Sequence, residues 1–115
     1  MVEVGVEEFE ELVADALDGL PAELARLMDN VAIFVQDESE EEPDLLGVYD
    51  GIPLTERTSS YVMAMPDRIF IYRLPTLRIS PDRDEVVRQV QITVVHEIAH
   101  HFGIDDDHLH DLGYD

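Results

Sequence analysis

The stretch from Ser80 to Phe102 limits the fold more than any other part of the chain. It opens with Ser80-Pro81-Asp82: a capping hydroxyl, a proline suited to a first helical position and an acid, which together signal a helix start. No glycine or proline follows until Gly103, which provides a stop. The β-branched run 90–94 alone suggests a strand, but the length of the stretch and its cap favour a helix that is buried on much of its surface. The apolar positions at helical spacing are Val87, Val90, Val94, Ile98 and Phe102.

Shorter elements fill the preceding part of the chain. Apolar residues at i, i+3 and i+4 spacing predict a helix from Val6 to Leu17, and Pro21 begins a shorter one that ends at Met28. Three or four short strands are expected: Val31 to Val35, Leu45 to Tyr49, Tyr61 to Ala64 and Ile69 to Tyr72, the last two separated by residues 65–68. Because so few residues lie between them, we expect a partly antiparallel sheet. The 115 residues suit one compact domain, 1–115, of the α+β class.

The charge balance is strongly acidic. Aspartate and glutamate number 27 against seven basic residues, all of them arginine, and the formal net charge is −20. Such a surface repels phosphate backbones and attracts divalent cations and basic peptides, so nucleic acid is not an expected partner. Solubility, or adaptation to a salty or crowded cell, explains the charge equally well. The acidic stretch 37–44 can bury little and is expected to form a flexible loop.

Three further features of the sequence indicate where in the cell the protein is located. No apolar run approaches the roughly 20 residues needed to span a bilayer, and the N-terminus lacks the basic and apolar regions of a signal peptide. The chain has no cysteine, which excludes disulfides and thiolate metal sites. We therefore expect a cytoplasmic protein with no membrane partner.

The segment His96-Glu97-Ile98-Ala99-His100 carries the strongest chemical signal. On a helix, residues four apart lie on one face with Cβ atoms about 6 Å apart, so His96 and His100 can direct two imidazoles at one metal ion. Glu97 is adjacent, within reach of a metal-activated water without being a ligand. Two surface histidines alone need no functional explanation, but the uncharged residues between them, with Gly103 and an acid beyond, favour a metal site. We expect one zinc ion that is used for hydrolysis.

The longer segment 96–106, HEIAHHFGIDD, resembles the zincin metallopeptidases, whose pattern is His-Glu-x-x-His-x-x-Gly-x-x-His/Asp. The chain is similar to a family of short bacterial zincin-like proteins, also in the stretches 46–54 and 110–114. The resemblance implies a minimal zincin-like fold, in which a small mixed sheet packs against helices that include the motif helix. It also implies a zinc-dependent peptidase that acts on peptides or proteins, with the metal held by His96, His100 and Asp106.

The residues alone leave the third ligand open. Spacing favours Asp106, but four other side chains lie close by: Asp105, Asp107, His108 and His110. In the implied mechanism Glu97 is the general base. Tyr114 is the candidate donor to the developing oxyanion, with His110 as an alternative.

Two other functions are compatible with parts of the sequence. One is a non-catalytic metal-binding or regulatory module, which a closed shell of four protein ligands would favour over an open fourth position. The other follows from the ending 112–115, which is similar to metal-dependent ribosomal-RNA processing factors; it ranks last, because their histidine spacing is absent and the charge of −20 opposes RNA binding. The ligand types do not separate zinc from other first-row metals.

Overall fold

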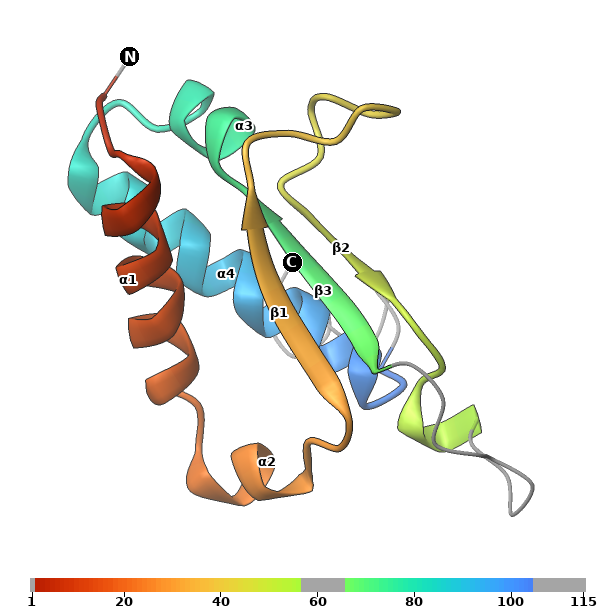
Figure 1. Ribbon diagram of the computed structural model, residues 1–115. Coiled ribbons are helices and arrows are strands. Elements are labelled where there is room, and N and C mark those ends of the chain that lie inside the picture. The colour runs from red at the N-terminus through yellow and green to blue at the C-terminus, as the bar shows by residue number, and fades with distance from the viewer. Residues whose placement is uncertain (1, 57–65, 105–115) are drawn as a thin grey trace.

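The computed structural model describes residues 2–56 and 66–104 and has the predicted α+β architecture (Figure 1). Its elements in chain order are α1 (Val6–Asp18), α2 (Ala22–Leu27), β1 (Val31–Gln36), β2 (Gly47–Asp50), the 3₁₀ turn η1 (Leu54–Glu56), β3 (Asp67–Tyr72), α3 (Arg73–Arg78) and α4 (Arg83–His101). The strand expected at Tyr61 to Ala64 lies outside the described residues. None of the described helices has the length and apolar character needed to span a membrane.

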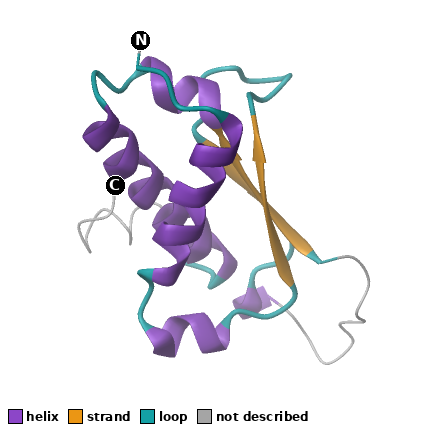
Figure 2. Cartoon of the chain, turned by 60° about the vertical axis from the view of Figure 1, so that its left-hand side comes forward, coloured by secondary structure: helices purple, strands orange, loops and turns teal. Residues whose placement is uncertain are grey.

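The sheet is mixed, as the spacing of the strands predicted. Its order is β1-β3-β2, with β1 parallel to β3 and β2 antiparallel to it. The register sets Ile33 beside Ile69 and Val35 beside Ile71, and these four side chains pack into the core with α1 and α4. Figure 2 shows the helices gathered on one side of the sheet. In the part of the chain that is described, the opposite side of the sheet carries no helix.

The core lies between that sheet face and the two long helices. Six of its side chains are almost completely buried: Phe9, Ile69, Ile71, Val86, Val90 and Val94. Each contributes about 1.5–3 kcal/mol by leaving water. This packing fixes α4, which carries the histidine motif, against both β2 and β3.

The start of α4 differs from the prediction. The N-cap is Asp82, whose side chain accepts a hydrogen bond from the Glu85 N–H at 2.9 Å, and Pro81 precedes the cap. Ser80 is not the cap, because its hydroxyl donates to the Thr76 carbonyl at 2.7 Å and so closes α3. Helix α3 was not predicted, since it is short and has Pro75 in its first turn. Proline is tolerated there because the first N–H groups of a helix have no intrahelical acceptor.

The end of α4 is the stop predicted at Gly103. This residue has φ +83°, and its N–H donates to the His100 carbonyl, while the Ile104 N–H donates to the Ala99 carbonyl, both at 2.9 Å. These two bonds form a Schellman motif. A Cβ at Gly103 would lie 2.1 Å from Thr55 Oγ1, so only glycine lets η1 sit this close to the helix end.

Asp67 joins several elements through its buried carboxylate. Tyr49 from β2 donates its hydroxyl to Oδ2, and the Ile52 N–H donates to Oδ1 at 3.2 Å. His101 from α4 is fully buried and brings Nδ1 to 3.2 Å from Oδ2. The Asp29 N–H donates to His101 Nε2 at 3.2 Å, so Nδ1 carries the ring proton and donates to Asp67. Residues 65–68 were expected only to separate two strands, so this role of Asp67 was missed.

We predict that Asp67→Asn lowers the free energy of unfolding by about 1–3 kcal/mol, because an amide cannot accept all three donors and leaves buried groups unpaired. Urea unfolding followed by circular dichroism measures the loss. Asp50→Asn is the matched control on β2: Asp50 is exposed and pairs with Arg68, so its change costs about 1 kcal/mol or less. Equal losses in the two variants would contradict the role given to Asp67.

Candidate metal centre

Three side chains of α4 converge on one point. The ring centroids of His96 and His100 are 4.7 Å apart with an interplanar angle of 75°. His96, Glu97 and His100 each offer one ligand atom, and these atoms lie within 4.8 Å of one another. Among residues 2–56 and 66–104 this is the one group of three such side chains so arranged. The helix therefore brings together the two imidazoles and the carboxylate that the motif pairs in sequence.

Glu97 is only 6% exposed, whereas the two histidines are half-buried. Its Oε1 is 3.1 Å from His100 Nδ1. A carboxylate only accepts, so Nδ1 is the donating nitrogen of this contact, and Nε2 is the ring atom that would ligate a metal. An acidic partner on the second ring nitrogen is the usual way of orienting a metal-binding imidazole.

Gly47 lets β2 lie directly beside the motif. A Cβ at this position would be 2.7 Å from Thr93 Cγ2, 3.0 Å from the Phe70 carbonyl oxygen and 3.4 Å from Glu97 Cγ. Any larger residue would push α4 away from the strand or displace Glu97. A glycine inside a predicted strand signals such a close approach, so Gly47 in the stretch 45–49 is the sequence signal for this contact.

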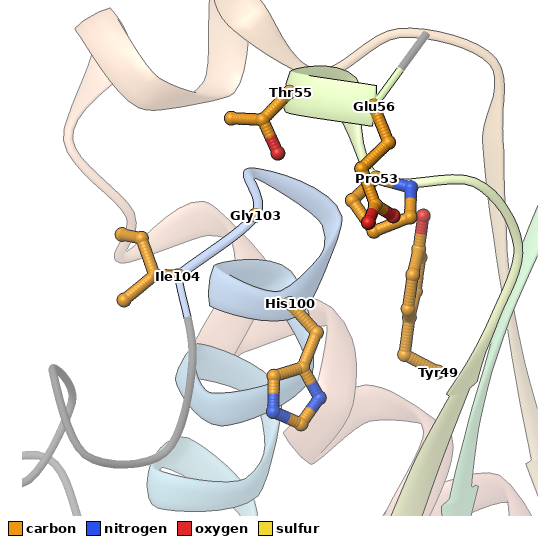
Figure 3. Close-up of a pocket in the computed structure, with 7 residues that line it drawn as sticks. All are labelled: Tyr49, Pro53, Thr55, Glu56, His100, Gly103 and Ile104. Atoms are coloured by element: carbon orange, nitrogen blue, oxygen red, sulfur yellow. The ribbon is translucent and has the colours of Figure 1, made fainter.

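Two hollows flank the motif along α4. One, of about 310 Å³, lies beside His96 and Glu97, with Leu46 and Gly47 on its β2 side and Gln89 and Ile92 on its helix side. The other, of about 270 Å³, lies beside His100. Figure 3 shows Tyr49 and Ile104 on opposite sides of the helix end that carries His100, with Pro53 and η1 above it. Each volume is near the lower limit for a small-molecule site. A hollow of this size is large enough for one side chain of a bound peptide.

His101 does not belong to the centre, although it follows His100 directly. It is fully buried, and its two ring nitrogens contact Asp67 and the Asp29 N–H. The other predicted site residues, Asp106 as third ligand and Tyr114 as oxyanion donor, lie outside the described residues. So do the alternatives to them: Asp105, Asp107, His108 and His110.

The donor set fits a divalent first-row metal ion. Imidazole nitrogen with carboxylate oxygen is a combination that zinc accepts, and two histidines one helical turn apart suit its tetrahedral geometry. His96 and His100 are the residues that would hold the ion. Glu97 is close enough to act on a water molecule beside it.

Comparisons with known proteins agree with this geometry. A family model described as a zincin-like metallopeptidase matches residues 28–114, which include all three strands and the whole of α4. A search of curated proteins found no match. The resemblance inferred from the motif is thereby confirmed. The chain belongs to the family of zincin-like metallopeptidases.

Proposed function

We propose that the protein is a zinc-dependent peptidase in which His96 and His100 bind the metal and Glu97 is the general base. The observation that carries the proposal is the convergence of these three side chains within 4.8 Å on a helix that is fixed against the sheet. A zinc ion held there would supply Lewis-acid activation of a water molecule and of the peptide carbonyl.

Glu97 is suited to move the proton. Its side chain adjoins both histidines and is shielded from solvent. It takes a proton from the water that attacks the carbonyl carbon, and delivers this proton to the amine nitrogen as the C–N bond breaks. We assign Asp106 as the third ligand from the spacing of the motif, and Tyr114 as the donor to the carbonyl oxygen.

An extended peptide suits the surroundings of the motif. Among the described residues β2 pairs only with β3, and Leu46 and Gly47 at its start line a hollow together with His96 and Glu97. A peptide added along the other edge of β2 would form main-chain hydrogen bonds with this strand. Its side chains before and after the cleaved bond would enter the two hollows that flank the motif.

One observation favours a second candidate, a metal-binding module without turnover. The 3.1 Å contact with His100 means that Glu97 can serve to orient a ligand instead of moving a proton. The two functions differ in the consequence of removing the charge of Glu97, because an orienting carboxylate affects metal affinity and a general base affects the rate.

We predict that the purified protein binds about one equivalent of zinc and that His96→Ala or His100→Ala weakens binding at least about 100-fold, since losing an orienting partner alone costs about 10–100-fold. Elemental analysis after dialysis and competition with a chelating dye measure this. Asp106→Ala tests the third ligand, and Gln91→Ala, at an exposed position on α4, is the control that should bind as wild type. Full zinc retention in both His96→Ala and Asp106→Ala would refute the site.

We predict that Glu97→Gln keeps stoichiometric zinc and lowers the rate of peptide cleavage by about 10²–10⁴-fold, the usual contribution of a positioned general base. Cleavage of a quenched fluorescent peptide library by zinc-loaded protein supplies the rate. Full activity in the variant would show that another group moves the proton. Zinc affinity that falls about 10–100-fold, with no turnover in the wild type, would instead identify the non-catalytic module.

A further inference from the structure

The side of the sheet opposite the helices carries a row of aromatic rings. The register places Phe34 of β1 beside Phe70 of β3, with ring centroids 5.5 Å apart, and Tyr72 stacks on Phe70 at 6.5 Å. Phe34 is 44% exposed. Val48 of β2 pairs with Phe70 and extends the apolar strip toward the edge of the sheet. Contiguous apolar side chains on a surface are typical of interaction sites, whereas scattered single ones are not.

The acidic loop 37–46 forms one wall of a groove over this strip. The groove has a volume of about 500 Å³, with Val48, Phe70 and Tyr72 as its floor and Glu38 and Glu40 to Glu42 among its lining residues. The connection between β1 and β2 rises beside the upper ends of the strands in Figure 1.

Arginines hold the two ends of that loop. Arg73 donates to the Asp37 carboxylate at 3.0 Å, and Arg78 donates to the Pro43 carbonyl at 2.7 Å. Arg78 also lies 3.6 Å from Glu38 and 3.9 Å from Asp44. Both ends of the loop therefore contact α3.

The charge of the groove is left largely unbalanced. In residues 2–56 and 66–104 no arginine lies within ion-pair distance of Glu40, Glu41 or Glu42. Three exposed carboxylates beside the partly exposed Phe70 ring suit a cation with an apolar stem, because the stem packs on the ring while the charged head meets the carboxylates. An anionic ligand such as a phosphate would be repelled.

The chain itself contains an example of this recognition on the same face of the sheet, at the end of β2 that is farther from the acidic loop. The guanidinium carbon of Arg68 lies 5.6 Å from the centroid of the Phe70 ring, and its Nη2 pairs with Asp50. One aromatic ring and one carboxylate thus hold a guanidinium on this sheet face. The groove offers the same combination with more carboxylates.

We propose that this groove docks a segment of a partner polypeptide that is rich in arginine or lysine. It is separate from the metal centre, because the sheet lies between the groove and the buried core face of α4. The inference goes beyond the proposed peptidase, since binding here needs neither metal nor turnover. The contact is small, so the complex is of the transient class and sensitive to salt.

The probe is a fluorescein-labelled octapeptide that alternates arginine and alanine, titrated into the full chain and followed by anisotropy. The variant with Glu40→Gln, Glu41→Gln and Glu42→Gln is expected to bind at least about 10-fold more weakly, because three charge pairs in the groove are lost. Phe70→Leu is expected to weaken binding about 2–5-fold through the lost cation–π contact. The same peptide with glutamine in place of arginine should not bind.

The matched control makes the same change of charge elsewhere: Glu7→Gln, Glu10→Gln and Glu11→Gln at exposed positions of α1. It should alter the affinity by no more than about twofold at physiological salt, where charges beyond about 8 Å are screened. Equal weakening in both triple variants would overturn the proposal, because net charge alone would then explain binding. Amide shifts in two-dimensional NMR should map to residues 34–50 and 68–72. Shifts centred on His96 and Glu97 would also overturn it, and would identify the peptide as a ligand of the metal centre.

Discussion

The close packing of α4 on β2 and β3 is the constraint on which the candidate metal centre depends. Metal and catalytic side chains must be held within about 0.5 Å of their working positions, which needs a rigid support. Three contacts supply it here. Gly47 allows the strand to touch the motif, the buried pair of His101 and Asp67 ties the last turn of α4 to the sheet, and Gly103 ends the helix against η1.

The buried polar contacts at the end of α4 fix its last turn against the sheet. A carboxylate and an imidazole in the interior are favourable only while every donor and acceptor is paired. His101 faces Asp67 and Asp29 and is fully buried, whereas His100 faces His96 and Glu97. Two adjacent histidines with the same chemistry thus have different roles, decided by which side of the helix each one faces.

Periodicity and spacing predicted much of this fold. Helical spacing identified α1 and α4, β-branched runs identified β1 and β3, and the i, i+4 pair predicted that His96 and His100 converge. Local signals failed where a distant partner decides the outcome. Ser80 carries a capping hydroxyl, but this hydroxyl donates to the Thr76 carbonyl of α3, a helix that was not predicted. Asp67 gains its role from Tyr49, Ile52 and His101, which are far from it in sequence. Asp106 and Tyr114 stay predictions, because they lie outside the described residues.

The two faces of the sheet carry different kinds of side chain. One carries the core and the histidine motif, and the other carries aromatic rings and unbalanced carboxylates. If the motif holds a metal ion through imidazole, zinc K-edge X-ray absorption of the metal-loaded protein will detect the ligands themselves. We predict two imidazole nitrogens at about 2.0–2.1 Å, with oxygen donors completing the shell. A spectrum that shows zinc bound by oxygen alone, without imidazole scattering, would contradict this prediction.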